Sequence, residues 1–384
     1  MDSPYAKEIR IAISVIQQAA LLSQSIITSP DKGVTEKGDL SPVTIADFAI
    51  QALLSATFHH HFPEDGLVGE ESADELRADE RLLGRVWGLV EGVGSRAAAA
   101  GGADTGDAAS RLWRVPESKE QACDLIDMCG SGTPGPGRVW VFDPIDGTKT
   151  YMRGQMYAIN CALLVDGKQT LSIVGLPNMS PDARGAITDK DIDPSGRGTV
   201  LFAARDHGAY LLPLRGALSG DGIEPRQLPA RRASTRTSAD SPAGQSLRFV
   251  TCTTVTDSGN DDLHRAVAES IGASFPGCDL LPWVARWCAL AMGLGDAVVW
   301  VYNKMSRRGK VWDHAGAMLL FEETGGKVTD VYGKDIDLRG GRTMDRNFSF
   351  VAAPADLHAE VLARTHDVLK QFGRRDVLEQ LAKL

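Results

Sequence analysis

The sequence has no long apolar run, few cysteines and no excess of basic residues. No stretch of about 18 consecutive apolar residues occurs, so the sequence predicts no transmembrane helix. Residues 1–10 include the acidic Asp2 and Glu8 and lack an apolar segment with a cleavage site, which is not the pattern of a secretory signal. We therefore expect a cytoplasmic protein without a membrane partner.

Cysteine is scarce as well. Six cysteines are present, and none is spaced as a C-x-x-C pair. A chain of 384 residues can bury a sizeable hydrophobic core without disulfides or a structural metal. In a chain of this size such cysteines are typical of buried thiols in a reducing compartment.

Basic residues are outnumbered by acidic ones. The chain has 41 Lys and Arg against 50 Asp and Glu, a formal charge of −9. This balance argues against binding of a nucleic acid polymer. The only residues that favour such binding are Arg231, Arg232 and Arg236, and a solvated loop explains them better. An acidic protein also fits poorly with a strongly anionic small molecule unless metal ions intervene. The share of hydrophobic residues, 43%, is that of an ordinary globular protein and excludes a wholly disordered or collagenous chain.

The pattern of apolar residues in the first part of the chain predicts helices and then a run of strands. The helices are expected at residues 8–27, 46–58, 75–93 and 118–129. The strands are expected at residues 138–142, 157–165, 170–176, 184–188, 199–205 and 209–214. Because no helices separate most of these strands, they indicate an antiparallel or mixed sheet.

A different pattern follows after residue 245. Residues 229–245 predict a linker or flexible loop, and residues 94–110 a surface insertion. Beyond the linker, helices and strands alternate: strands are expected at residues 247–252, 297–302 and 348–353, and helices at 261–271, 283–292, 312–323 and 356–372. We therefore expect an N-terminal α+β domain at residues 1–235 and a C-terminal α/β domain at residues 246–384.

The sharpest motif is D-P-I-D-G-T at residues 143–148. It follows the apolar run 139–142 and so begins at the end of a predicted strand, where α/β proteins place ligands. The carboxylates of Asp143 and Asp146 can converge around a turn made tight by proline and glycine. Mg²⁺ takes oxygen ligands of this kind, and Thr148 adds a hydroxyl. Alone, the segment can also be a turn with an Asx cap.

Four further acids add to this motif. Glu70 and Glu71 follow a short apolar run, Asp313 opens a predicted helix, and Asp47 begins another. Each has an ordinary explanation when it is taken alone, because adjacent glutamates occur on surface loops and an acid at a helix start is commonly a cap. The combination in this order is far more specific than any single acid.

Together these motifs resemble the signature of the lithium-sensitive, magnesium-dependent phosphatase superfamily, which includes inositol monophosphatases and 3'(2'),5'-bisphosphate nucleotidases. The resemblance covers residues 8–365 and is nearest to the nucleotidase branch. The segments that carry it are S-P-V-T at 41–44, G-E-E at 69–71, L-A-M-G-L-G-D at 290–296 and K-V-W-D-H-A at 310–315. It implies an α/β protein with an αβαβα layered sandwich of the inositol monophosphatase and fructose-1,6-bisphosphatase type, with the active site between two domains.

The resemblance also implies a set of metal ligands. Glu70, Asp143 and the backbone carbonyl of Ile145 would hold one Mg²⁺. Asp143 would bridge it to a second ion, held together with Asp146 and Asp313. Two cations can neutralise a phosphate monoester, stabilise the leaving oxygen and lower the pKa of a bound water. Carboxylates packed this closely cannot all stay ionised without cations, because like charges raise one another's pKa.

Further roles follow from the same resemblance. A third, weaker ion would lie near Asp47 and Glu70, and Glu71 would support the site without contacting an ion. Asp47 and Thr148 would form the catalytic pair, in which the carboxylate orients the hydroxyl and the hydroxyl accepts the proton of the attacking water. If the backbone amides of Gly147 and Thr148 begin a helix, they can bind phosphate oxygens.

The segments that select the substrate depart from the nucleotidase pattern. That branch has a loop rich in serine and histidine after the strand at 248–252, whereas this chain has Asp257 and Ser258 and no histidine there. A carboxylate beside a second phosphate is repulsive unless it binds a hydroxyl. At the next helix, Trp283 and Arg286 replace a serine and a lysine. Arg286 can bind phosphate bidentately, whereas Trp283 either stacks on a base or packs against the next helical turn.

We therefore expect a Mg²⁺-dependent phosphomonoesterase that hydrolyses the 3'(2')-phosphate of a nucleoside 3'(2'),5'-bisphosphate by attack of water. The alternatives are an inositol phosphate phosphatase, or a diverged relative that acts on another phosphorylated small molecule by hydrolysis or by elimination of phosphate. The expected partner is a small phosphorylated substrate, and the expected cofactor is two to three Mg²⁺ ions. With these ions bound, the acidic patch accepts an anionic substrate.

Overall fold

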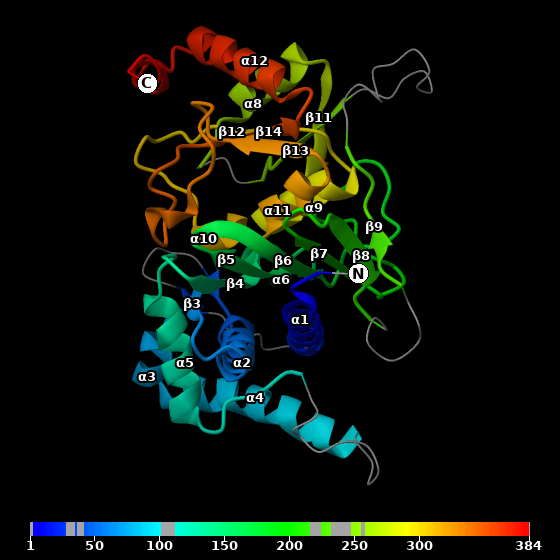
Figure 1. Ribbon diagram of the computed structural model, residues 1–384, viewed down its shortest axis with the longest axis vertical. Helices are drawn as coiled ribbons and strands as arrows, with labels where there is room; N and C mark the ends of the chain where they lie inside the picture. The colour runs from blue at the N-terminus through cyan, green and yellow to red at the C-terminus, as the bar shows by residue number, and fades with distance from the viewer. Residues whose placement is uncertain are drawn as a thin grey trace.

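A mixed sheet of seven strands forms the broadest layer of the protein (Figure 1). The computed structural model describes residues 3–27, 35–36, 42–100, 112–215, 224–231, 247–254 and 258–383. The first strand pairs in parallel with the second and the later pairs are antiparallel, which confirms the expected mixed sheet. In spatial order the strands are β3 (Gly66–Gly69), β4 (Arg138–Asp146), β5 (Ala158–Val165), β6 (Lys168–Leu176), β7 (Thr199–Ala204), β8 (Ala209–Pro213) and β9 (Arg226–Gln227).

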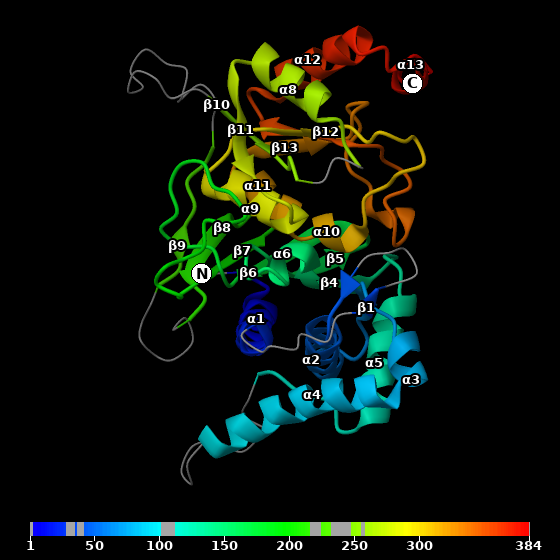
Figure 2. The same ribbon diagram turned by 180° about the vertical axis from the view of Figure 1, so that it is seen from behind.

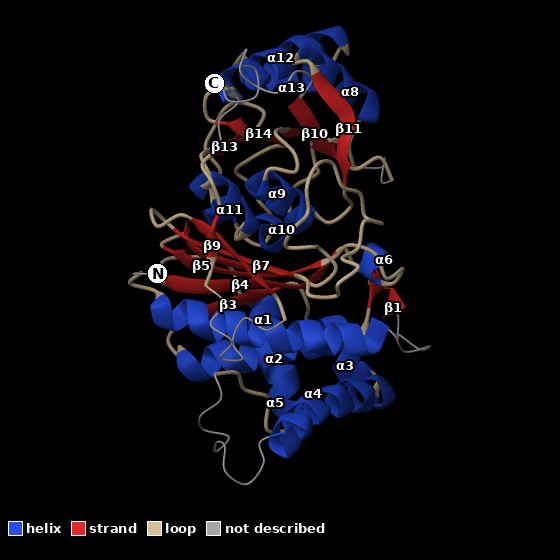
Figure 3. Ribbon diagram, turned by 90° about the vertical axis from the view of Figure 1, so that its right-hand side faces the viewer, coloured by secondary structure: helices blue, strands red, loops and turns tan. Residues whose placement is uncertain are grey.

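Two long helices, α1 (Ala6–Ile27) and α2 (Ile45–His61), cover one face of this sheet (Figure 3). The short strands β1 (Thr35–Glu36) and β2 (Pro42–Val43) precede α2. Two more helices pack against α2, α4 (Glu80–Ala100) and α5 (Lys119–Ser131), and the short α3 (Asp74–Ala78) packs against these two. This side of the molecule therefore brings the beginning of α2 close to the end of β4.

The other face of the sheet carries a second layer of helices, then further strands and an outer layer of helices (Figure 2). The inner helices are α9 (Trp283–Met292), α10 (Val311–His314) and α11 (Ala317–Glu323). The strands are β10 (Leu247–Thr251) paired in parallel with β11 (Ala273–Asp279), and the antiparallel set β12 (Val298–Trp300), β14 (Phe350–Pro354) and β13 (Gly326–Thr329). The outer helices are α8 (Asp261–Ser270), α12 (His358–Gln371) and α13 (Arg375–Leu381). The expected αβαβα sandwich is thus confirmed.

The strands in the middle of the large sheet are buried on both faces. In β4, Val139 and Val141 belong to the core shared with α9 and α11, whereas Trp140 and Phe142 belong to the core shared with α1 and α2. Successive side chains of a strand point to opposite faces, so helices on both sides favour apolar residues at every position. The acidic end of β4 therefore interrupts an otherwise apolar strand.

By length and composition, α1 is apolar enough to cross a membrane, and among the described helices it alone meets that test. However, 61% of its most apolar window is buried inside the protein. The helix lies on β6 and beside α2, and its buried side chains belong to the core beneath the large sheet. This degree of burial is that of a core helix.

Several predicted elements differ from the structure. Residues 184–188 form no strand, and only Thr188 makes an isolated bridge, to Asp279. The helix expected at 312–323 is two helices, α10 and α11, which are separated at Gly316, where a Cβ atom would lie 2.7 Å from Asn160 Oδ1. The insertion expected at 94–110 is helical up to residue 100 in α4, and its remainder lies outside the described residues.

Other expectations concern thiols and domain boundaries. All six cysteines are buried and free of disulfides, as the sequence predicts. The proposed linker at 229–245 lies largely outside the described residues, so the domain boundaries stay a prediction. Two short helical elements complete the fold, α6 (Thr148–Tyr151) after β4 and the 3₁₀ turn η2 (Leu338–Gly340).

Candidate active site

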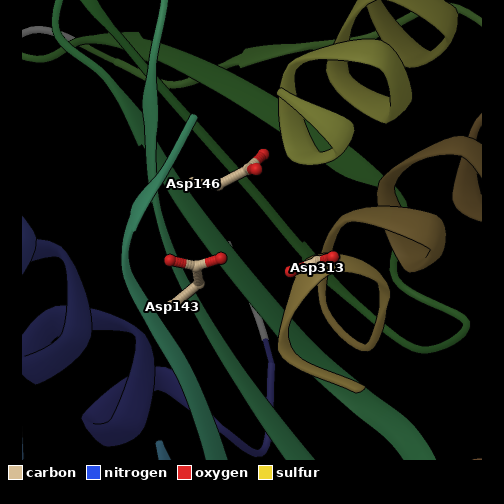
Figure 4. Close-up of side chains that lie close together, drawn as sticks. All are labelled: Asp143, Asp146 and Asp313. Atoms are coloured by element: carbon tan, nitrogen blue, oxygen red, sulfur yellow. The ribbon is translucent and has the colours of Figure 1, made fainter. Parts of the chain in front are cut away.

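Three carboxylates from distant parts of the chain meet between the large sheet and the inner helices (Figure 4). Asp143 and Asp146 lie at the end of β4, and Asp313 lies in α10. One oxygen atom of each residue lies within 4.8 Å of the others. The two aspartates of β4 are buried and Asp313 is half-buried. We call these three residues the acidic cluster.

The end of β4 is irregular, and this irregularity positions its aspartates. The register with β5 shifts between Asp143 and Asp146. Gly147 follows with a φ of 87°, a left-handed conformation that glycine adopts without steric cost. A Cβ atom at Gly147 would lie 2.5 Å from Pro282 Cγ, so the approach of α9 also requires glycine here. The motif therefore combines a tight turn with a contact to the C-terminal part of the chain.

Asp146 connects the acidic cluster to the beginning of α9. Its Oδ2 atom accepts a hydrogen bond of 2.6 Å from the Val284 amide. Burial raises the pKa of Asp146 to about 7, and this effect outweighs the lowering by the Val284 amide and the Arg286 guanidinium. The carboxyl group is therefore held in a fixed position, and near neutral pH it is only partly ionised in the absence of a cation.

Asp143 and Asp313 are likewise unfavourable places for negative charge. Burial, followed by the charges of Glu70 and Asp146, raises the pKa of Asp143 well above its ordinary value. Burial and the same two neighbours raise the pKa of Asp313. The Oδ1 atom of Asp143 is buried and lacks a hydrogen-bond partner in the described part of the chain. Such a set of oxygen atoms fits a hard divalent cation, which would relieve the repulsion.

The loop that carries Glu70 and Glu71 is held through its backbone from two sides. The Gln51 side chain of α2 donates from Nε2 to the Glu71 carbonyl at 2.7 Å and accepts from the Glu71 amide at 2.9 Å. Arg342, from the C-terminal part, donates to four carbonyls: those of Gly69 (2.6 Å), Glu70 (3.2 Å), Cys129 (3.0 Å) and Gly132 (3.1 Å). The sequence analysis missed both residues, because nothing in their types or spacing indicates a backbone acceptor.

Asp47 lies buried in the first turn of α2. Its Oδ2 atom accepts hydrogen bonds from the amide and the hydroxyl of Thr44, at 2.8 and 2.6 Å. Its charge contributes to the raised pKa of Asp143, which places Asp47 near the acidic cluster. The Thr148 hydroxyl donates to the Ile145 carbonyl at 3.3 Å. These bonds give Asp47 and Thr148 separate partners, so their direct pairing stays a prediction.

The architecture and the acidic cluster can be compared with known proteins. The sequence model of the inositol monophosphatase family matches residues 115–370, more than half of the chain. The chain belongs to this family. A 3'(2'),5'-bisphosphate nucleotidase of Emericella nidulans is 35% identical over 373 residues, covering 95% of this chain and 99% of the relative. A protein of the same name from Schizosaccharomyces pombe is 31% identical over 369 residues, covering 93% and 94%.

Solved structures of the inositol monophosphatase fold match nearly the whole chain. One of them, described as an IMPase/NADP phosphatase complexed with Mg²⁺ and phosphate, superimposes with a TM-score of 0.54. It covers 94% of this chain and 96% of its own, at 18% sequence identity. A likeness at this identity shows the fold, and it agrees with the layers described above.

In this family member a cavity of about 260 Å³ opens beside the acidic cluster. Its lining includes the acids Glu70 and Asp313 together with Gly147 and Thr148. Thr148 begins α6, with Gly147 as the residue before the helix, as the sequence predicts. The binding of phosphate by their amides stays a prediction.

Arg286 and Trp283 line the same cavity. The Arg286 guanidinium lies beside two indole rings, 4.2 Å from the centre of Trp283 and 4.5 Å from that of Trp300. Its Nε and Nη2 atoms donate to the carbonyls of Leu280 and Leu281, at 2.7 and 2.9 Å. Nη1 is buried and has no partner in the described part of the chain. Bidentate binding of a phosphate by Arg286 therefore stays a prediction. The two hydrogen bonds to backbone carbonyls make such binding less favourable.

The two expected uses of Trp283 are not exclusive in the structure. Its ring stacks on Trp287 with centroids 5.8 Å apart, and it also lines the cavity. Ser258 lines the cavity as well, whereas Asp257 lies outside the described residues. Stacking on a base stays a prediction.

Asn160 is a further positioning residue that the sequence analysis missed. It is fully buried in β5, and its Nδ2 atom donates to the Trp312 carbonyl at 2.6 Å. This bond fixes α10, and with it Asp313, against the sheet that carries the other two aspartates. The signal was an amide in the middle of the apolar strand predicted at 157–165, because a buried polar side chain requires a partner.

Proposed function

We propose that this family member is a phosphomonoesterase that depends on a divalent cation and hydrolyses the 3'(2')-phosphate of nucleoside 3'(2'),5'-bisphosphates. The observation that carries the proposal is the acidic cluster, three close carboxylates in which burial and the neighbouring acids raise the pKa of Asp143 and Asp313, so that a bound cation would favour their ionised forms. The names of the two fungal relatives supply the substrate class. The buried, unpaired thiols agree with the cytoplasmic location that we retain as part of the proposal.

The acidic side chains would hold two to three Mg²⁺ ions. One set consists of Glu70, Asp143 and the carbonyl of Ile145, and a second consists of Asp143, Asp146 and Asp313. All donors are oxygen atoms, which is the ligand type that Mg²⁺ prefers. When bound, the cations would offset the charge of the phosphate and favour ionisation of the attacking water.

The remaining chemistry belongs to side chains around the cluster. Asp47 and Gly147 would complete the site around the acidic cluster. A third, weaker ion would lie near Asp47 and Glu70. Thr148 Oγ1 would receive the proton of the attacking water and pass its own toward the Asp47 carboxylate, while Glu71 supports the loop. Glu71 fits that role because its backbone is fixed by Gln51. The scissile phosphate would lie against the Gly147 and Thr148 amides.

Phosphate release from a substrate panel tests this proposal. The panel contains adenosine 3',5'-bisphosphate, adenosine 3'-monophosphate and several inositol phosphates, each assayed with Mg²⁺ and with EDTA. We expect release that requires Mg²⁺ and a preference for the bisphosphate. Turnover of inositol phosphates alone would refute the nucleotide substrate and support the inositol phosphatase alternative. Mass analysis of the organic product distinguishes hydrolysis from elimination, because only hydrolysis adds the elements of water.

A further inference from the structure

A second chamber adjoins the cavity of the acidic cluster. Its volume is about 430 Å³, and Arg307, Arg308 and Lys310 line it. Trp283 and Arg307 line both spaces, as does Asp313, so the chamber is continuous with the acidic cluster. We call this space the cationic chamber, after the side chains of Arg307, Arg308 and Lys310. These residues lie in the segment that leads from β12 into α10. The sequence analysis named Lys310 only as part of the K-V-W-D-H-A segment and did not single out Arg307 or Arg308.

The charges of the chamber are not neutralised by neighbouring acids. None of the three cations takes part in an ion pair in the described part of the chain. Arg307 is exposed, and its guanidinium makes no hydrogen bond to the described residues. Apart from Asp313, the acid that lines the chamber is Asp345, which accepts a hydrogen bond from Thr343 Oγ1 at 2.9 Å. Three positive groups therefore face two negative ones in a protein with a charge of −9.

The three cations differ in how free they are. Arg308 uses Nη1 to donate to the carbonyls of Met305 and Arg307, at 2.6 and 2.8 Å. The Lys310 ammonium lies 5.6 Å from the centre of the Trp312 ring. Arg307 alone keeps its whole guanidinium for a ligand, whereas Arg286 on the other side of Trp283 donates to two carbonyls. A free guanidinium binds phosphate through two parallel hydrogen bonds.

We propose that the cationic chamber holds the second, non-reacting phosphate of the substrate and that Arg307 is its principal contact. This inference rests on the proposed function. With the reacting phosphate at the acidic cluster, the sugar would pass Trp283, which lines both spaces. Asp345 would face hydroxyl groups rather than phosphate. The chamber thus selects a bisphosphate over a monophosphate, and it does so without the histidine that the nucleotidase pattern places in the preceding loop.

Kinetics of Arg307→Gln on two substrates test the chamber. Adenosine 3',5'-bisphosphate carries the second phosphate and adenosine 3'-monophosphate lacks it. Loss of a charge-assisted contact should raise the KM for the bisphosphate by about 10- to 100-fold. The kcat should stay within about threefold, and the KM for the monophosphate should not change. Arg364→Gln, which removes an exposed arginine of α12, is the matched control and should leave all values unchanged.

A binding measurement separates the chamber from the proposed function. Adenosine 5'-monophosphate retains only the second phosphate, so its dissociation constant, measured by calorimetry with Mg²⁺, should rise by the same factor in Arg307→Gln. Equal effects on both substrates, or none on either, would overturn the chamber while turnover by the wild type would still support the proposed function. Binding that depends on Arg307, with no phosphate release by the wild type, would refute the function and support the chamber.

Discussion

The cavity beside the acidic cluster and the cationic chamber share lining residues, yet the two places hold their charges in different ways. The aspartates of β4 are buried and Asp146 is fixed by the Val284 amide, whereas Arg307 and Lys310 are exposed to solvent. A buried charge without a partner is very unfavourable, so a bound cation would stabilise the acids. An exposed cation keeps its charge without a partner, and water and salt weaken its reach. We infer that the cluster supplies catalysis and that the chamber supplies selectivity.

The largest effect is expected for Asp313→Asn. Asparagine keeps the shape of the side chain but removes a metal ligand, and even partners outside the ligand set typically cost 10- to 100-fold. Because Asp313 would itself be a ligand, we expect kcat to fall by at least about 100-fold, the upper end of that range. Because a buried like charge is removed, the melting temperature without metal should not fall. Retained activity would contradict the assignment of catalysis to the acidic cluster. The control is Glu360→Gln, at an exposed position of α12.

The second prediction concerns pH in the absence of metal. Burial raises the pKa of Asp146 from its ordinary 3.8 to about 7. Between these values the folded state binds more protons than the unfolded state, so stability is greatest at low pH and falls as pH rises toward 7. The loss should be on the order of a few kcal/mol. Denaturant unfolding in EDTA from pH 5 to 8 measures it. Asp146→Asn should flatten the slope, and an unchanged slope would contradict the assignment.

A third, smaller effect is expected from Mg²⁺ itself. A ligand that binds only the folded state at 100 times its dissociation constant stabilises it by about 2.7 kcal/mol. The melting temperature should therefore rise by a few degrees with saturating Mg²⁺ and return with EDTA. The rise should be lost in Asp313→Asn and kept in Arg307→Gln. An equal loss in both variants would erase the distinction between cluster and chamber.

The smallest effect is expected for Lys310→Gln. Lys310 lies at the edge of the chamber, and its exposed ammonium is screened by water, so its contribution should be that of a surface charge, about 0.2–1 kcal/mol. The KM for the bisphosphate should rise by less than about fivefold. Steady-state kinetics at low and high salt measure it, because the effect should shrink as salt rises. A larger effect than in Arg307→Gln would reverse the proposed order of contacts.

The sequence predicted the fold class from local signals, whereas the acids of the cluster became candidates only as a combination that resembles a known signature. The periodicity of apolar residues indicates strands and helices, and D-P-I-D-G-T interrupts an apolar strand at its end. The strands β3, β11 and β13 were missed, since β3 is only four residues long and β11 contains Pro276 and Gly277, which are typical of turns. Arg307 was missed because an exposed arginine in a loop becomes a candidate only when the fold places it beside Asp313.

Arg342 has a consequence for how this molecule can change over evolution. Its four acceptors are main-chain oxygens, which every amino acid provides. A substitution of Arg342 releases all four bonds at once, whereas the acceptor oxygens do not depend on the side chains of the residues that carry them. Gly69 and Gly132 are constrained for another reason, because a Cβ atom would lie 2.7 Å from the Gln51 side chain at Gly69 and would overlap the Leu67 carbonyl oxygen at Gly132. We therefore expect the arginine to be retained among close relatives without pairwise covariation with its contact positions. The hydrogen bonds between the C-terminal part of the chain and the loop that carries Glu70 therefore depend on the side chain of one residue.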